Sequence, residues 1–217
     1  NIMAENMFQI NYDVTKKSKL QKFYDDKKVY IYTISITIIL IIFLSTFYAD
    51  KKVKKREDLS QRYVQAKIYL ENENNIEAID ILKKIIFSDD PTYSSLSLFL
   101  IIDNNLISNN EDVSLLFDHI LKNNKFNSEI RNLIIYKKAL FNSNYVSEFK
   151  ILEDTKPLMK EKNLWKPQTL YLLGNYYAYN NQYIKASEFF AEILSIPNLP
   201  KDFYDQARSQ LLVISSE

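Results

Sequence analysis

Cysteine is absent from this chain of 217 residues, and histidine occurs once, as His119. Without cysteine the protein has no disulfide, no thiolate metal ligand, no cysteine nucleophile and no cysteine-linked lipid anchor. A single histidine leaves no second imidazole for a metal centre. The neighbouring Asp118 leaves a helix in a different direction from His119, so the two do not form an acid–base pair. We therefore expect no metal site and no catalytic role for His119.

Glycine is almost absent too, and the only one is Gly174. One glycine cannot build a glycine-rich phosphate loop. The formal net charge of +1 argues against a nucleic-acid partner held by counterion release. The acidic pairs Glu111-Asp112 and Glu153-Asp154 are typical of helix starts or surfaces, not of two carboxylates across a cleft. We expect a protein that is not an enzyme and has no cofactor and no small-molecule substrate.

One long apolar run is present, VYIYTISITIILIIFLSTFYA, at residues 29–49. As a helix it is about 31 Å long, close to the hydrocarbon thickness of a bilayer. Tyr30, Tyr32, Phe47 and Tyr48 stand at its two ends, as interfacial aromatic residues do. A cleaved signal peptide is the alternative, but the run is longer than the apolar part of one. We predict a transmembrane helix at 29–49 that contacts membrane lipid.

Basic residues flank this run on both sides. The N-terminal tail, 1–28, has six lysines, and residues 50–64 have six basic residues, so the positive-inside rule nearly ties. The charged connector DKKVKKRED at 50–58 is either a solvated extension of the helix or a contact to anionic headgroups, and we favour the former. From residue 57 onward 22 acidic residues face 17 basic ones, so the large domain is mildly acidic.

The remaining domain, 59–217, has apolar residues at helical spacing and no sustained alternation typical of strands. We predict an all-α domain. Asp90 before Pro91 is a predicted N-cap. Pro157 falls inside the sixth predicted helix, which should break or kink near Thr155. The predicted helices are 57–72, 75–88, 92–108, 111–123, 127–142, 145–162, 167–180, 182–196 and 200–215.

Two helix pairs share one pattern of a small residue, a second small residue twelve positions later, and a large apolar residue four further on. These positions are Ala66, Ala78 and Leu82 in the first pair and Gly174, Ala186 and Phe190 in the last. This is the tetratricopeptide pattern, in which two antiparallel helices cross where both carry small residues and the large residue fills the space beside the crossing. A side chain at Gly174 would push the pair apart.

The middle pairs match this pattern poorly. Val113 and Phe117, then Glu148 and Leu152, fall roughly at the corresponding positions, but the small residues are missing. We predict a tetratricopeptide-like solenoid of four degenerate pairs, followed by a C-terminal helix that covers the end of the stack. A generic helical bundle is the alternative.

Asparagine occurs where glycine is missing. Helix ends commonly need a residue with positive φ, and asparagine is the next choice after glycine. Asparagines cluster at nearly every predicted turn, at positions 72, 74 and 75, 109 and 110, 123 and 124, 142 and 144, and 180 and 181.

Stacked helix pairs form a concave face from the first helix of each pair, where an extended peptide can bind. Side-chain amides and aromatic rings suit such binding, and a solvated surface without a ligand is the alternative. The candidate residues are Tyr63, Lys67 and Glu71 in the first pair and Gln168, Tyr171, Asn175 and Tyr179 in the last.

With span and repeats placed, the chain resembles the bacterial ancillary Sec-translocon subunit family, whose defining part is a tetratricopeptide-repeat-like domain. The similarity lies in the order of tail, span, connector and helix pairs, and in RYVQAKIYLENENNIEAIDILKKIIF (62–87), LYLLGNYYAYNNQYIKASEFFAEIL (170–194) and DFYDQARSQL (202–211). The resemblance implies a single-pass inner-membrane protein of a Gram-negative-type bacterium, with a cytoplasmic N-terminus and a periplasmic domain. It implies translocon subunits, periplasmic chaperones or exported polypeptides as partners of a non-catalytic scaffold.

Three other functions remain open. An accessory or assembly subunit of another inner-membrane complex would associate stably with that complex and not with a translocon. A cytosol-facing peptide-binding adaptor would have the reversed topology. A hydrolase would need an activity that is lost on changing Asp118 or His119, and we expect none.

Overall fold

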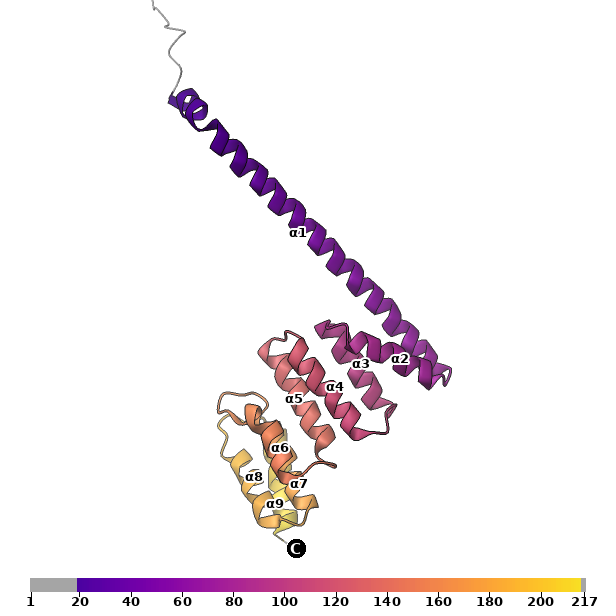
Figure 1. Cartoon of the computed structure of the whole chain (residues 1–217). Coiled ribbons are helices and arrows are strands. Elements are labelled where there is room, and N and C mark those ends of the chain that lie inside the picture. The colour runs from indigo at the N-terminus through magenta and orange to yellow at the C-terminus, as the bar shows by residue number, and fades with distance from the viewer. Residues whose placement is uncertain (1–18, 216–217) are drawn as a thin grey trace, which may run out of the picture. The chain divides into compact units, whose positions relative to one another are not determined.

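A computed structural model describes residues 19–215 (Figure 1). Within this range the chain has nine α-helices, one short 3-10 helix and no strand. The prediction of an all-α protein with one long apolar N-terminal helix is therefore confirmed. The elements are α1 (Lys19–Glu71), α2 (Asn75–Ile86), α3 (Pro91–Asp103), α4 (Asn110–Asn123), α5 (Ser128–Asn142), α6 (Glu148–Thr155), η1 (Lys156–Met159), α7 (Lys166–Tyr179), α8 (Tyr183–Leu194) and α9 (Lys201–Ile214).

The predicted helix boundaries differ most from the observed ones at the first, third and sixth helices. The first, predicted at 57–72, is the end of α1, and the sixth, predicted at 145–162, is observed as α6 and η1 over residues 148–159. The third helix ends at Asp103, five residues earlier than predicted, because Asn105 takes a positive φ of 50°. The predicted break at Pro157 is confirmed, since α6 ends at Thr155 and a single 3-10 turn follows. Proline lacks the N–H that an α-helix needs and clashes with the preceding turn, which explains the change of helix type.

The chain divides into two units at Lys55/Arg56, and α1 contributes to both. The first 90 residues contain neither glycine nor proline, so nothing in the sequence interrupts α1 over its 53 residues. Residues 19–28 of the predicted N-terminal tail belong to this helix, and residues 1–18 lie outside the described range. The predicted connector, 50–58, is a continuation of the same helix.

The predicted span lies in the part of α1 whose side chains are exposed. Among the described residues this is the one helix that is long and apolar enough to cross a membrane. Its hydroxyl groups bond back to the helix: Ser35 Oγ donates to the Ile31 carbonyl at 2.8 Å, and Thr37 Oγ1 donates to the Thr33 carbonyl at 2.8 Å. These bonds satisfy the polar groups inside the helix itself, which is compatible with an apolar surrounding.

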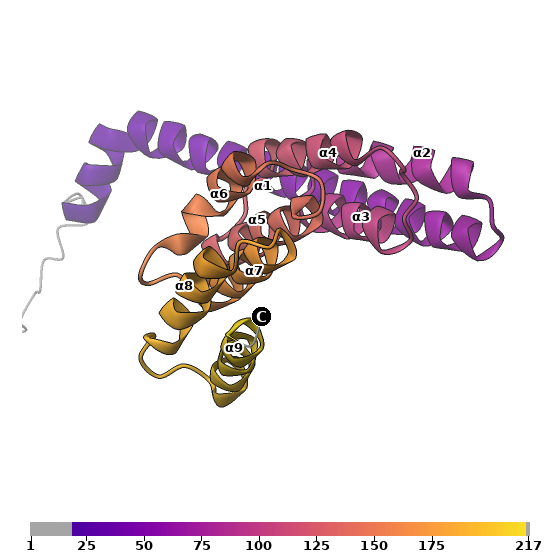
Figure 2. The same cartoon turned by 90° about the horizontal axis from the view of Figure 1, so that it is seen from below.

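In the unit formed by residues 56–217, helices that follow each other along the chain pack against each other. The contacts join α2 with α3, α3 with α4, α4 with α5, α7 with α8 and α8 with α9. Figure 2 shows α9 as the last helix of this series, beyond α7 and α8. Two apolar clusters hold the unit together. One cluster contains residues of all five helices from α1 through α5, around Leu82, Phe117 and Ile120. The other contains residues of α7, α8 and α9, around Leu170 and Phe190.

Polar side chains define several helix ends. Asp90 is the N-cap of α3, as predicted, and its carboxylate accepts hydrogen bonds from the N–H groups of Thr92 and Tyr93, both at 3.0 Å. Asn109 and Asn127 cap α4 and α5 in the same way. Positive φ angles occur at Glu73, Asp89, Asn105, Asn181 and Asn198. Asparagine therefore takes three of these five positions, but only Asn181 belongs to a predicted cluster. In the predicted cluster at 72–75 the positive φ falls on Glu73, and Asn109 and Asn123 act through a cap and a side-chain bond instead.

Gly174 lies on α7 directly against Phe190 of α8. A Cβ atom built on Gly174 would stand 2.6 Å from Phe190 Cε1 and 2.7 Å from Phe190 Cζ, well inside van der Waals contact. The Phe190 ring is fully buried and packs edge-on against Tyr171 at a centroid distance of 5.6 Å, so it has little room to move. The single glycine of the chain thus stands where the neighbouring helix fills the space of a side chain.

Candidate functional site

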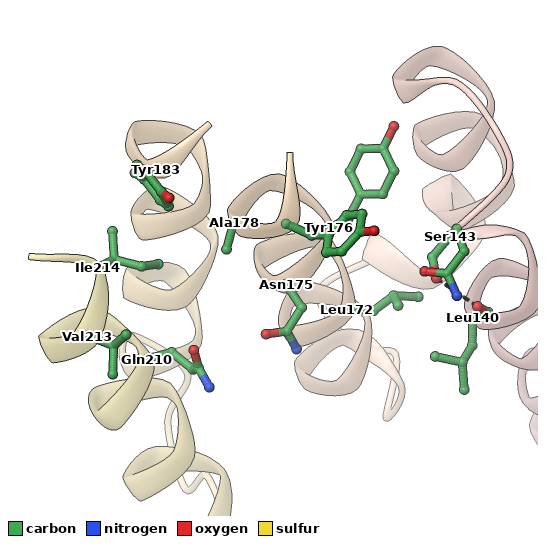
Figure 3. A pocket seen from close by; sticks show the side chains of 12 residues that line it. Leu140, Ser143, Leu172, Asn175, Tyr176, Ala178, Tyr183, Gln210, Val213 and Ile214 are labelled. Carbon is green, nitrogen blue, oxygen red and sulfur yellow. Dashed lines mark hydrogen bonds between the residues drawn. The ribbon is translucent and has the colours of Figure 1, made fainter. Parts of the chain in front are cut away.

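A groove of about 710 Å³ opens between the end of α5, the inner side of α7 and the last turns of α9 (Figure 3). Two of the predicted binding residues, Asn175 and Tyr179, line it. Tyr179 is the more exposed of the two, with 83% of its surface accessible. The volume of the groove falls within the range of about 300–1,000 Å³ that is usual for ligand sites.

The lining of this groove is uncharged. Figure 3 draws its 12 residues, which are Leu140, Ser143, Asn144, Leu172, Asn175, Tyr176, Ala178, Tyr179, Tyr183, Gln210, Val213 and Ile214. A quarter of the chain is charged, so a lining of this size without an acidic or basic residue is a distinct feature. The walls combine aliphatic side chains with hydroxyl and amide groups.

Some polar groups of the groove are used within the fold and others are not. Tyr176 donates its hydroxyl to the Val146 carbonyl at 3.3 Å, and Ser143 donates to the Leu140 carbonyl at 2.8 Å. The side-chain amides of Asn144, Asn175 and Gln210 form no hydrogen bond with any residue in the described range 19–215. Donor and acceptor groups therefore remain available inside the groove.

Four asparagines at helix ends behave differently. Each donates its side-chain amide to the carbonyl four residues earlier, at 2.7 to 3.0 Å: Asn72 to Ile68, Asn104 to Leu100, Asn123 to His119 and Asn180 to Tyr176. The carbonyls of Ile68, Leu100 and Tyr176 also accept the backbone N–H of the same asparagine, so the side-chain amide is a second donor to the last turn of the helix. Asn175 stands inside α7, where the backbone needs no such help.

The other predicted residues of the last pair lie outside this groove. Tyr171 is half-buried and packs against Phe190, so it belongs to the apolar cluster. Gln168 lines a second groove of about 740 Å³ between the α6–α7 and α8–α9 connections, together with apolar residues such as Leu164 and Phe203. Its Oε1 atom is buried and has no hydrogen-bond partner among the described residues. The four predicted residues of the last pair therefore do not line a single groove.

The first pair forms a smaller cleft. Lys67 and Glu71 of α1 line a space of about 280 Å³ with Leu100 of α3 and Asn104, the residue after that helix. Tyr63 is half-buried against the first apolar cluster and lies 6.3 Å from Tyr93 by ring centroids. Burial, and secondarily the charge of Asp103, raise the pKa of Tyr63. The seven predicted residues therefore do not form one continuous site.

The predicted helix-crossing positions all lie in the core. Ala66, Ala78, Leu82, Gly174, Ala186 and Phe190 are buried. Val113 and Phe117 of the second pair are buried too. In the third pair the assignment of Glu148 and Leu152 is wrong, because Leu152 is 37% exposed and Ile151 and Thr155 are buried instead. The short α6 places its buried face three residues later than the repeat spacing predicts.

Sequence reasoning missed a buried polar network between α4, α5 and α6. Lys138 of α5 is 5% exposed, and its ammonium lies 2.7 Å from Asp118 and 3.3 Å from Asp154. Asn142 donates to the Asp154 carboxylate at 3.2 Å, and Lys150 lies 3.2 Å from the same group. The signal available in the sequence was a lysine on the apolar face of a predicted helix, between Ile134 and Ala139 and beside Asn142.

A second polar contact joins α6 to α7 and α8. The Glu148 carboxylate accepts hydrogen bonds from Lys185 at 2.7 Å and from the Tyr177 hydroxyl at 3.0 Å. The Lys185 bond, followed by the Tyr177 bond, lowers the pKa of Glu148. Burial, followed by the bond to Glu148, raises the pKa of Tyr177 to about 12. Lys185 also stands over the Tyr177 ring at 5.1 Å.

His119 has structural neighbours on every side. Its Nε2 lies 3.0 Å from Asp89 and its Nδ1 lies 3.0 Å from the amide of Asn123, while Phe87 packs edge-on at 4.6 Å. In the described part of the chain, no group of three or more histidine, aspartate or glutamate side chains is arranged to hold a metal ion. The uncharged groove is therefore the candidate site that the structure supports best.

Comparison with known proteins adds no family: no family model, no curated protein and no solved structure matches this chain.

Proposed function

We propose that the protein is a non-catalytic scaffold, anchored to a membrane by α1, that binds a segment of another protein in the groove between α5, α7 and α9. The observation that carries this proposal is the groove itself, whose lining holds free amides and exposed apolar side chains but no charged or metal-binding group. Such a lining suits binding of a polypeptide and lacks the charged groups used in acid–base chemistry.

We also propose that residues 56–217 form a tetratricopeptide-like series of helix pairs. The support is the equivalence of Ala66, Ala78 and Leu82 with Gly174, Ala186 and Phe190, all of which are buried between consecutive helices. The groove is lined chiefly by α5, α7 and α9, which are first helices of the pairs or the helix after them. First helices form the concave face in stacks of this kind.

Photocrosslinking from the full-length protein in cells tests the binding site. A photoreactive amino acid at Asn175 should form an adduct with a partner, and the same residue at the exposed Glu188 of α8, which does not line the groove, should not. An adduct that contains a translocon subunit or a periplasmic chaperone would support a role beside the Sec translocon. Equal adducts at both positions, or none at Asn175, would contradict binding in the groove.

Adducts with another membrane complex would instead favour an accessory or assembly subunit of that complex. An adaptor that binds peptides in the cytosol is the remaining alternative, and topology separates it from the first two. We propose that the N-terminus is cytoplasmic and the helical domain periplasmic, in the inner membrane of a bacterium.

The absence of cysteine makes topology simple to measure. Single cysteines at Ser216 and, separately, at Ser18 are labelled in intact cells with a thiol reagent that does not cross the inner membrane, after the outer membrane has been made permeable. Labelling at Ser216 alone is the expected result. Labelling at Ser18 alone would contradict a periplasmic domain and would favour the cytosolic adaptor.

A further inference from the structure

The groove between α5, α7 and α9 has a chemistry that narrows the class of its ligand. This step rests on the proposed function, since it concerns the same site. Figure 3 shows Asn175 of α7 and Gln210 of α9 projecting into the space between the two helices. Asn144, two residues beyond the end of α5, also lines the groove. Groups of one kind, free side-chain amides, therefore occur on all three walls.

A side-chain amide offers two N–H donors and one carbonyl acceptor. The main chain of an extended peptide offers one donor and one acceptor per residue, so an amide side chain can bond both. Recognition through the main chain is independent of the ligand's side chains. Inside a helix an asparagine is a weak helix former, and Asn175 gains no hydrogen bond there that would offset this cost.

Charge excludes another class of ligand. None of the lining residues is acidic or basic, so a carboxylate or ammonium group entering the groove would lose water without gaining an opposite charge. Aliphatic groups do gain contacts: Leu140 is 44% exposed and Val213 is 52% exposed on opposite walls. Apolar side chains of a bound peptide would cover this exposed surface.

We infer that the groove binds an extended, uncharged stretch of polypeptide through its main chain, with little dependence on sequence. The inner-facing amides of Asn175 and Gln210 bond the peptide N–H and carbonyl groups. Leu140 and Val213 contact its apolar side chains, and the exposed ring of Tyr179 offers a further contact. An unfolded or newly exported segment has this chemistry, whereas a charged terminal motif does not.

Peptide binding to the full-length protein in lipid nanodiscs tests this inference. The probe is a fluorescent peptide of about nine residues that alternates valine with serine and asparagine and is blocked at both ends, so that it has no charge. Two analogues replace its central valine by aspartate or by lysine, which places a charge on the face that enters the groove. A third keeps the sequence but carries N-methyl groups on alternate main-chain nitrogens, which removes donors and leaves the side chains.

The uncharged peptide should bind, and each of the three analogues should bind about tenfold more weakly or worse. In the N-methylated analogue each lost hydrogen bond weakens binding roughly fivefold, and in the charged analogues the new charge loses water without gaining a partner. Asn175→Leu and Gln210→Leu should each weaken binding about fivefold. Gln65→Leu is the matched control, because Gln65 is an exposed amide on α1 outside the groove, and it should leave binding unchanged. Asn175→Asp should shift the preference toward the lysine analogue.

Charged analogues that bind as tightly as the uncharged peptide, or N-methylation without effect, would overturn the inference. In either case a photocrosslink from position 175 to the peptide would leave the proposed docking groove intact. Failure of every peptide to bind, together with no crosslink from position 175, would overturn the proposed function as well. Unfolding midpoints of the variants that equal that of the unaltered protein show that lost binding does not reflect lost structure.

Discussion

Single residues set close limits on how α7 and α8 pack. Gly174 is the position where the requirement is strictest, because the space of its missing side chain is taken by the buried ring of Phe190. Phe190 in turn packs against Tyr171, a predicted binding residue that the fold uses as core. The burial of Lys138 is also explained by single residues, because carboxylates from α4 and α6 are partners of its ammonium group.

Gly174→Ala should destabilise the protein although alanine favours a helix. The added Cβ would stand 2.6 Å from the Phe190 ring, and overpacking of this kind costs about 1–3 kcal/mol, against a gain of about 1 kcal/mol in helix propensity. We expect a net loss of about 1–2 kcal/mol, measured by urea unfolding in detergent with the fluorescence of Trp165. Adding Phe190→Leu should relieve the clash, so that the double variant loses less than the sum of the single ones. Additive losses would show that the ring does not limit position 174.

Lys138→Met should cost about 3–5 kcal/mol in the same measurement, because it leaves the Asp154 carboxylate, 7% exposed, without its buried positive charge. Lys150→Met is the matched control: Lys150 approaches the same carboxylate at 3.2 Å but is 42% exposed, and its loss should cost less than about 1 kcal/mol. Adding Asp154→Leu to Lys138→Met should recover part of the loss. Equal effects of the two lysine substitutions would contradict a dominant role of Lys138.

At the scale of elements, short α6 is held in place by polar contacts at both of its ends. Asp154, near its C-terminal end, joins the Lys138 network of α4 and α5. Glu148, at its first residue, binds Lys185 of α8 and Tyr177 of α7. The helix has only eight residues, with Ile151 and Thr155 as its buried side chains, so these polar contacts matter more here than in the longer helices.

The attachment of α6 to α7 and α8 should depend on pH in two windows. The pKa of Glu148 is lowered in the folded protein, so its contribution is present above the ordinary glutamate pKa of about 4.5 and is lost as the pH falls through the lower folded value. The pKa of Tyr177 is raised to about 12, so its contribution is present below pH 10 and is lost as the pH rises from 10 to about 12.

Glu148→Gln should therefore flatten the acid side of a curve of unfolding free energy against pH, and Tyr177→Phe should flatten the alkaline side. Glu153→Gln, which changes an exposed carboxylate one turn further along α6, is the control for the acid window. Acid curves of Glu148→Gln and of the unaltered protein that run parallel would show that the Glu148 contact adds nothing to stability.

At the scale of the whole molecule, contacts in the unit 56–217 are mostly between helices that are close in sequence, and two separate apolar clusters result. Stacks of this kind have stabilities that add up from each element and its immediate neighbours. A change at one end should therefore lower the stability of the adjacent helices and have a smaller effect on each helix further along the series.

Removing α9, by ending the chain after Pro200, tests this property. Ala207 of α9 is fully buried in the cluster that also contains Leu170 and Phe190. Hydrogen exchange should rise in α7 and α8 and remain unchanged in α2 and α3, which share no cluster with α9. The control is the exposed substitution Gln206→Ala on α9, which should change neither region. A uniform rise from α2 to α8 would contradict nearest-neighbour stability.

The sequence by itself determined the helices and most of their ends, since helical periodicity, Asp90 and Pro157 act over a few neighbouring residues. It also determined the apolar run of α1 and the buried crossing positions around Gly174 and Ala66. Only the tertiary structure decided which residues on one side of α7 face a groove. Tyr171 packs against Phe190, and Gln168 lines the groove between the helix connections. Asn175 and Tyr179 line the groove between α5, α7 and α9. The partners of Lys138 come from helices 20 and 16 residues away in sequence, and local periodicity holds no information on contacts at that distance.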